Sequence, residues 1–233
     1  MALRREMDVT ANNLANLNTT AFKREQVAFR EYVMSAQGLD SEPFADTSFV
    51  QDYGVSRVVL EGDLIPTGNT FDLAISGKGF FSVMGRSGET LYTRNGQLAI
   101  SPDGILVNQT GNPILDVGGA EIELSSGDTN IAISEDGLIT SALGPVAQIS
   151  LVSFLDEQGM KKVGDGLFRT EELAEPALDA RIKQGALEGS NVQAINEITR
   201  MVQIVRAYQS TSKLLEQVQE LERKAAERLG QAG

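Results

Sequence analysis

Carboxylates are the side chains of this chain that could do chemistry, because its 233 residues include no histidine and no cysteine. Their absence excludes Ser-His-Asp and thiol mechanisms in their usual forms and removes the usual zinc ligands. A glycoside hydrolase needs two carboxyl groups on either side of the bond it breaks. Nothing in the sequence sets two carboxylates on facing strands, so solvated surface charge is the favoured interpretation. The acidic residues considered are Glu171 with Glu172, Glu121 with Glu123, Asp156 with Glu157, and Asp116.

Other short motifs also fall short of a binding site. Gly77-Lys78-Gly79 lacks the longer glycine frame of a phosphate-binding loop, so it predicts a tight turn. Asp103-Gly104, Asp136-Gly137 and Asp165-Gly166 lack the alternating oxygen ligands that calcium needs and also predict turns. We therefore expect no cofactor, no metal and no enzymatic activity.

Composition excludes further classes of partner. The net charge is −12 and the sequence pI is about 4.5, so nucleic acid and anionic membrane surfaces would be repelled. No run of 18 or more apolar residues is present, so we expect no membrane insertion. Polar residues follow Met1-Ala2-Leu3, where a cleavable signal would have an apolar core. If the protein leaves the cytoplasm, it is expected to do so without such a signal.

Residues 1–20 predict an amphipathic helix. Its apolar positions step by four and three residues, as in a coiled-coil seam. The helix is short and would be only marginally stable alone in water, so its apolar seam needs a partner. It consists of Leu3, Met7, Thr10, Leu14 and Leu17.

Residues 190–229 predict a second and longer helix, with Ser190 or Asn191 as its N-cap. At about 1.5 Å per residue it would be about 55 Å long. Its apolar stripe has two adjacent edges and is wide. One edge consists of Ile195, Ile198, Val202 and Val205, and the other of Met201, Ile204, Tyr208, Thr211, Leu215 and Val218.

The middle of the chain predicts an extended connector at 21–54, with a short helix around 26–34, and then strands at 55–185. Apolar and polar residues alternate there, and Asn95-Gly96 between two such runs predicts a β-hairpin. The expected fold class is α+β and mainly β. An antiparallel sandwich or open barrel would be flanked by terminal helices that pair as a coiled coil.

Three motifs resemble the signatures of bacterial flagellar rod and hook proteins, in the order of that family. They cover nearly the whole chain, and its length and detail favour the proximal rod (FlgF) type over the distal rod type. Family members usually carry Gly where this chain has Ala21, and a left-handed backbone there would strain alanine. They also carry further residues before the matching segment, so a shorter N-terminal helix is expected. The N-terminal motif is Ala11–Asn16 with Thr19–Lys23, the central one is Gly77–Phe81, Tyr92–Gly96 and Asp103–Val107, and the C-terminal one is Leu187–Val192 with Met201, Arg206–Tyr208 and Lys213.

The resemblance implies a structural subunit of the flagellar basal body, in the periplasmic rod, a hollow shaft that transmits torque for motility. Such axial proteins self-assemble through their terminal helices and pass through the flagellar type III export apparatus. Implied partners are other copies of the chain and other proximal and distal rod proteins. The expected subunit-assembly residues are Leu3, Met7, Ala11, Asn12, Asn13, Leu14, Leu17, Ile195, Ile198, Met201, Val202, Val205, Tyr208, Leu215 and Val218.

Three alternatives stay open at this stage. The first is a distal rod or hook-type axial protein of the same family. The second is a secreted enzyme that acts on glycan with a carboxylate pair. The third is a soluble adaptor or chaperone that offers the C-terminal helix to a partner.

Overall fold

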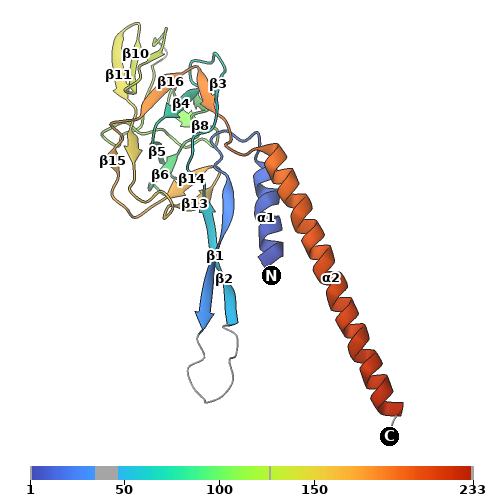
Figure 1. The fold of residues 1–233 in the computed structure, drawn as a ribbon. Coiled ribbons are helices and arrows are strands. Elements are labelled where there is room, and N and C mark those ends of the chain that lie inside the picture. The colour runs from blue at the N-terminus through green and yellow to red at the C-terminus, as the bar shows by residue number, and fades with distance from the viewer. Residues whose placement is uncertain (1, 35–46, 126, 232–233) are drawn as a thin grey trace. The chain divides into compact units, whose positions relative to one another are not determined.

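The chain forms two units, each assembled from segments that lie far apart in the sequence (Figure 1). The computed structural model describes residues 2–34, 47–125 and 127–231. The first unit comprises Met1–Ala15, Glu25–Ser56 and Gln193–Gly233, and the second comprises Asn16–Arg24 and Arg57–Val192.

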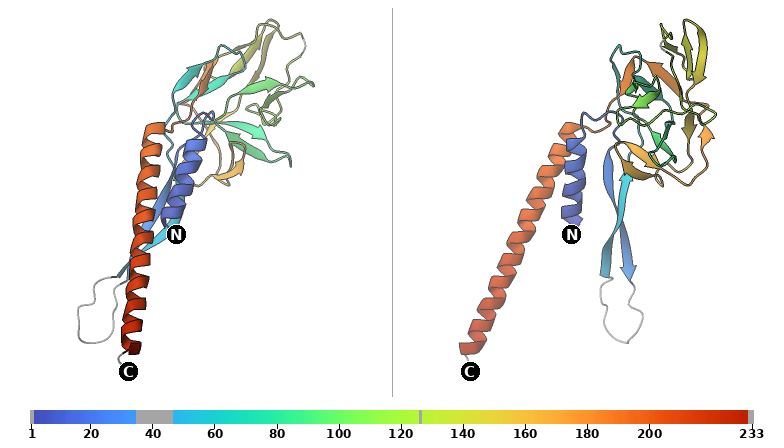
Figure 2. Two further views of the ribbon diagram at one scale, coloured as in Figure 1. Left: turned by 90° about the vertical axis from the view of Figure 1, so that its right-hand side faces the viewer. Right: turned by 180° about the vertical axis from the view of Figure 1, so that it is seen from behind.

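The first unit contains both helices and one two-stranded sheet. Its helix α1 (Ala2–Ala15) lies along the first part of α2 (Ala194–Gln231) and runs in the opposite direction, as Figure 2 shows. Helix α2 has 38 residues and is therefore about 57 Å long at about 1.5 Å per residue. No helix in the described part of the chain is long and apolar enough to cross a membrane. The sheet consists of β1 (Glu25–Met34) and β2 (Thr47–Arg57).

The short helix expected around residues 26–34 was wrong, because β1 occupies this segment. Val27, Phe29 and Val33 favour a pleated strand, and β2 supplies the hydrogen-bonding partner that a lone segment would lack. Tertiary pairing with a strand that comes later in the chain therefore decided its conformation. Residues 35–46 of the expected connector lie outside the described residues.

The second unit is built from strands, and its described strand pairs are antiparallel, which confirms the mainly β fold class. Its sheets are small, and none of those described closes into a barrel. The largest sheet has the order β13 (Lys161–Gly164), β14 (Leu167–Arg169), β6 (Thr90–Thr93), β5 (Phe80–Met84), β12 (Leu151–Ser153) and β15 (Glu175–Pro176). A three-stranded sheet has the order β11 (Gly144–Gln148), β10 (Leu138–Ser141) and β9 (Ala132–Ile133). Three pairs complete the unit: β4 (Leu73–Ser76) with β16 (Arg181–Gln184), β3 (Leu64–Pro66) with β17 (Ala186–Glu188), and β7 (Leu98–Ile100) with β8 (Leu106–Asn108).

Two apolar clusters stabilise this unit, and β5 contributes to both of them. Phe81 and Val83 lie in the larger cluster with side chains of β4, β10 and β16, while Phe80 lies in the smaller, aromatic one. Side chains alternate between the faces of a strand, so apolar residues at successive positions of β5 cover both faces. In the aromatic cluster the ring of Phe80 lies 6.0 Å from those of Phe154 and Phe168, centroid to centroid.

The Asn95-Gly96 hairpin prediction was wrong. Strand β6, before this dipeptide, pairs with β5 and β14, and β7, after it, pairs with β8. Glycine is needed there for a different reason, since a Cβ on Gly96 would lie 1.8 Å from the carbonyl oxygen of Leu73. The Leu73 amide in turn donates to the Gly96 carbonyl oxygen at 2.8 Å. The backbones at Leu73 and Gly96 thus lie too close together for a side chain at residue 96. The local sequence around Gly96 does not predict this contact.

We predict that Gly96→Ala destabilises the second unit by about 3 kcal/mol, because the added methyl group must displace the Leu73 backbone. Urea unfolding followed by circular dichroism measures the change. Gly127→Ala is the matched control, because its Cβ meets only a Leu143 methyl group at 3.6 Å. Equal stability of the two variants would contradict the close approach.

Candidate functional site

Glu188 is the centre of a buried ion cluster in the second unit. Strand β17 alternates buried and half-buried positions, so Ala186 and Glu188 both face inward. Glu188 is 1% exposed, although an ionised carboxylate without partners would be very costly there. The polar atoms around it must therefore offset that cost.

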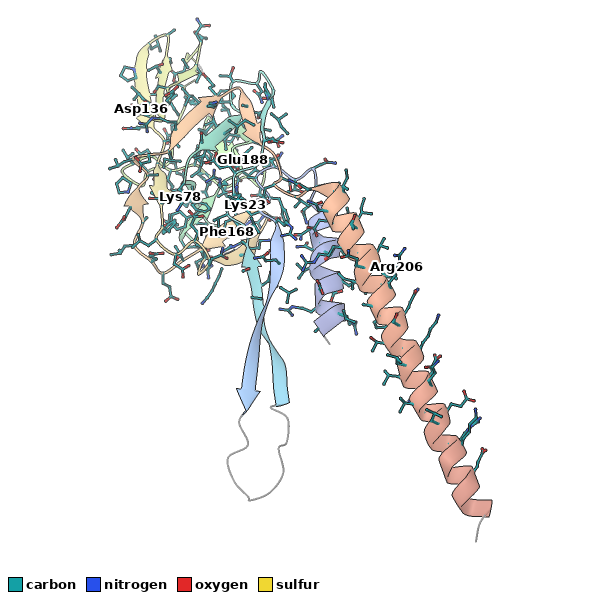
Figure 3. The ribbon with its side chains drawn as sticks, in the orientation of Figure 1. Lys23, Lys78, Asp136, Phe168, Glu188 and Arg206 are labelled. Carbon is teal, nitrogen blue, oxygen red and sulfur yellow. The ribbon has the colours of Figure 1, made fainter. Side chains whose placement is uncertain are left out.

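Two cations from distant parts of the chain share the Glu188 carboxylate, and Figure 3 labels one of them, Lys23, together with Glu188. Lys23 Nζ lies 2.5 Å from Oε1, and Arg94 Nε lies 2.7 Å from Oε2. Both cations are themselves inside the unit, with side chains 10% and 5% exposed. The Gly62 amide adds a 3.0 Å hydrogen bond to Oε1.

The remaining donors of the two cations bind backbone carbonyl groups. Arg94 donates to Gly79 O at 3.1 Å and to Ile75 O at 3.2 Å, and Lys23 donates to Leu60 O at 2.8 Å. The planar guanidinium group suits such a fixed set of acceptors. The cluster therefore fixes backbone positions as well as neutralising charge.

The charges of the cluster shift its pKa values. Burial alone would raise the pKa of Glu188, but the charges of Arg94 and Lys23 and the hydrogen bonds from both lower it below its ordinary 4.5. Burial lowers the pKa of Lys23, and Glu188 offsets this only in part, because nearby Arg94 also disfavours a second positive charge. The carboxylate is the group whose ionised form the cluster stabilises.

Asn191, which follows Glu188 closely in the chain, binds the backbone of two of the segments that Lys23 also holds, at Arg24 and at residues 58–60. We expected Ser190 or Asn191 to cap the second helix, but α2 begins at Ala194 and the Asn191 side chain is used elsewhere. Its Oδ1 accepts from the Arg24 amide at 2.6 Å, and its Nδ2 donates to Val58 O and Leu60 O at 2.8 Å each. The N-cap expectation was wrong because tertiary partners used the hydrogen bonds of this amide.

Ala21 has the left-handed backbone that the sequence had raised as a source of strain. Its φ is +57°, in a region where a Cβ is unfavourable. Its amide donates to the Glu188 carbonyl oxygen at 2.8 Å. The bend thus brings residues 19–24 alongside β17, where Lys23 reaches the Glu188 carboxylate.

The first unit has a separate polar contact, centred on Asn13. The side chain of Asn13 exchanges two hydrogen bonds of 2.8 Å with the backbone of Glu25 and donates to Glu197 Oε2 at 3.2 Å. Asn13 and Glu197 are both buried, and Arg200 binds Glu6 nearby at 2.8 Å. These contacts join α1, the start of β1 and the first turns of α2.

The expected seam of α1 is offset from the face that the structure buries. Val9, which was not in the seam, is buried together with Thr10 and Asn13, whereas Leu3, Met7 and Leu14 are half-buried. Ala11 and Asn12 are exposed, and Leu17 lies beyond α1, which ends at Ala15. Of the α1 residues expected to contact other subunits, Asn12 and Asn13 both make side-chain hydrogen bonds within the chain.

The apolar stripe of α2 is largely uncovered. Ile204 is 4% exposed and Met201 is half-buried, and Ile195 is 80% exposed. The other expected assembly residues of α2 are also exposed: Ile198, Val202, Val205, Tyr208, Leu215 and Val218. Within the described part of the first unit these side chains stay exposed.

Three of the acidic residues considered for catalysis, Asp116, Asp156 and Glu172, accept hydrogen bonds from backbone amides. Asp116 Oδ1 accepts from Gly118 and Ala120, and Glu172 accepts from Leu155 and Asp156. Glu121 and Glu123 follow one another on a single segment. Among the described residues no group of three or more acidic side chains could hold a metal ion. The geometry gives Asp116, Asp156 and Glu172 structural roles in turns and loops.

Sequence reasoning did not identify Lys23, Arg94 and Glu188 as site residues, although each lies inside one of the three motifs. A weak signal was present, since Glu188 shares the inward phase of β17 with Ala186. The local sequence cannot predict that these three side chains pair, because 165 positions separate Lys23 from Glu188.

Comparison of the sequence with known proteins identifies its family. Three family models match: the flagella basal body rod protein at residues 1–23, the flagellar hook protein FlgE/F/G D1 domain at 74–141, and the C-terminal region of flagellar basal body rod FlgEFG proteins at 183–228. The flagellar basal-body rod protein FlgF of Caulobacter vibrioides is 43% identical over 99% of this chain and 94% of its own length. The chain belongs to the flagellar basal-body rod protein family.

Further relatives define its place in the family. FlgF of Mesorhizobium japonicum is 34% identical over 99% of this chain and 94% of its own length. FlgG of Agrobacterium fabrum is 31% identical over 92% of this chain and 90% of its own length. The identities support the FlgF type within the family. The matches at 1–23 and 183–228 contain Lys23 and Glu188, and the match at 74–141 contains Arg94.

We predict that Glu188→Gln destabilises the second unit by about 3–5 kcal/mol, because two buried cations lose their counter-charge. Urea unfolding at neutral pH measures the loss. Glu171→Gln is the control, since it removes one carboxylate from an exposed position and should change stability by less than about 0.5 kcal/mol. A Glu188→Gln change as small as the control's would contradict the role of the cluster.

We also predict how pH changes the difference in unfolding free energy between the unsubstituted chain and Glu188→Gln. The Glu188 pKa is lower in the folded than in the unfolded state, so its contribution is complete above the unfolded pKa of about 4.5 and is lost as pH falls through the folded pKa. The stability gap between the unsubstituted chain and Glu188→Gln should therefore narrow in acid. Unfolding curves measured from about pH 7 to about pH 3 test this, and a gap that stays constant would overturn the assignment.

Proposed function

We propose that this chain is a structural subunit of the flagellar basal-body rod and that it assembles through its terminal helices. The observation that carries the proposal is the exposed apolar stripe of α2. Soluble proteins seldom leave such a contiguous surface open unless something binds it. Family membership and the rod names of the relatives support the same function.

The stripe has two parts with different neighbours. Ile204 and Arg200 lie on the part that faces α1, and the contacts of Asn13 and Glu6 hold α1 there. Ile195, Ile198 and Val202 lie away from that contact and are exposed. We propose that α1 and α2 pair as a coiled coil within one subunit and that the exposed part packs against neighbouring subunits.

Assembly of this kind produces a shaft. Contacts between different surfaces of successive copies do not close, so they generate a helical filament. We propose that the helices line the periplasmic rod, that other rod proteins of the proximal and distal segments complete it, and that the shaft transmits torque. Passage through the type III export apparatus belongs to the same proposal. A distal rod role is the alternative, and the higher identity to the FlgF relatives favours the proximal one.

We predict that Val202→Asp and Leu215→Asp each reduce rod assembly at least about tenfold, because a charge would enter an apolar subunit contact. Swimming assays and immunoblots of isolated basal bodies measure the loss. Gln203→Asp is the matched control, because it adds the same charge at an exposed polar position next to Val202.

The second unit should stay folded in all three variants, since the substituted side chains are exposed and belong to the first unit. Circular dichroism of the purified variants checks this. Normal motility with Val202→Asp and Leu215→Asp would refute the proposed assembly surface.

A further inference from the structure

Asn13 is a buried carboxamide in the contact between the two helices of the first unit. It is 1% exposed, and so is Glu197 in the first turn of α2. Asn13 Nδ2 donates to Glu25 O at 2.8 Å and to Glu197 Oε2 at 3.2 Å, while its Oδ1 accepts from the Glu25 amide at 2.8 Å. Both hydrogens of the amide nitrogen are therefore used, and the carboxamide is held from two sides.

The apolar part of this contact does not fix the position of α1 along α2 in the same way. Hydrophobic attraction is non-directional. Met201 and Ile204 continue the side of α2 on which Glu197 lies, because residues three and four apart are neighbours on a helix surface, and Tyr208 follows one turn later. If apolar contact alone held α1, a shift of one or two turns would bring it against similar side chains.

An acidic partner for Asn13 exists at one place along this side of α2. Between Glu197 and Glu216 the sequence of α2 has no acidic residue. A shift of α1 by one or two turns would move Asn13 from Glu197 to Met201 or Ile204, whose side chains offer no oxygen acceptor. A buried donor that loses its acceptor is costly. The Asn13–Glu197 pair therefore favours one register over its neighbours.

The ion pair between the helices discriminates less between registers. Arg200 Nη2 lies 2.8 Å from Glu6 Oε1, and these side chains are 42% and 23% exposed. Long side chains in contact with water can follow a shifted partner, and exposed ion pairs contribute little free energy. The register thus depends mainly on the buried pair.

We propose that Asn13 is a positioning residue that sets the register of α1 on α2, with Glu197 as its partner. Single buried polar residues have this role in other helix pairs, where they specify alignment at a cost in stability. The register decides which part of the α2 stripe α1 covers and which part stays exposed for neighbouring subunits. The inference rests on the proposed rod function and adds to it the residue that defines the assembly surface.

Spin-label distances measure the register, since the chain has no cysteine of its own. Nitroxide labels at Asp8→Cys and Gln209→Cys, two exposed positions, report the position of α1 along α2. Dilution with unlabelled chain keeps the measured distances within one molecule. One distance is expected when Asn13 is present. With Asn13→Leu we expect an additional distance, displaced by about 5 Å for a shift of one turn or about 11 Å for two.

Asn12→Leu is the matched control, because it makes the same change at the neighbouring exposed position and should keep the single distance. An unchanged single distance with Asn13→Leu would refute the positioning role. A distribution without a defined maximum would refute it as well, since α1 would then have detached and Asn13 would supply affinity rather than register.

Exchange of the two polar groups separates positioning from a general loss of stability. Asn13→Asp sets a second carboxylate against Glu197, so repulsion between like charges should displace α1. Glu197→Gln in the same chain restores a donor and an acceptor across the contact, with residue 197 now donating. The original single distance should return in this double variant. A failure to return would count against the pair as the determinant of register.

The consequence for the rod is measured separately. Asn13→Leu should lower the amount of the chain in isolated basal bodies at least about tenfold, because a shifted α1 covers part of the stripe that neighbouring subunits use. A normal amount despite a shifted spin-label distance would show that the register does not define the assembly surface. Absence of the unsubstituted chain from basal bodies would instead refute the rod function and leave the spin-label result intact.

Discussion

The second unit depends on one shared carboxylate. Glu188 binds Lys23 from near the start of the chain and Arg94 from its middle, and all three side chains are buried. A buried charge that loses its partner is far more costly than a surface charge, so the three groups stabilise the fold only together. Residues 19–24, 57–62, 75–94 and 185–191 are consequently fixed to one another by a single set of polar contacts.

The sequence separation of these contacts has an energetic consequence. Bringing together groups 165 positions apart costs chain entropy, although this cost grows only slowly with loop length. Once the segments meet, the cluster adds Asn191, whose amide binds the backbones of Arg24, Val58 and Leu60. The left-handed Ala21 shows that some local strain is tolerated to make this junction. The three family motifs thus meet at the place where these contacts form.

The first unit has a buried polar contact between its two helices and an exposed apolar surface along α2. Asn13 and Glu197 are buried and hydrogen-bonded to each other within the chain, and Ile204 of α2 is also buried. Apart from half-buried Met201, the apolar side chains of the α2 stripe are exposed, along a helix about 57 Å long. A helix of this length gains most of its stability from packing, so an uncovered stripe is consistent with a subunit that is completed by its neighbours.

The sequence by itself determined the features that depend on local periodicity and on turn chemistry. It predicted both helices, the antiparallel β character of the middle and turns such as Asp136-Gly137, where Gly137 has a φ of +86° between β9 and β10. Only the tertiary structure decided which face of α1 is buried, what Asn191 binds, why residue 96 is glycine and that residues 25–34 form a strand. Each of these depends on a partner far away in the chain, such as Leu73 for Gly96 or Glu188 for Lys23. Local propensity contains no information about such partners, because the free energy that selects them comes from desolvation and contact in the folded state.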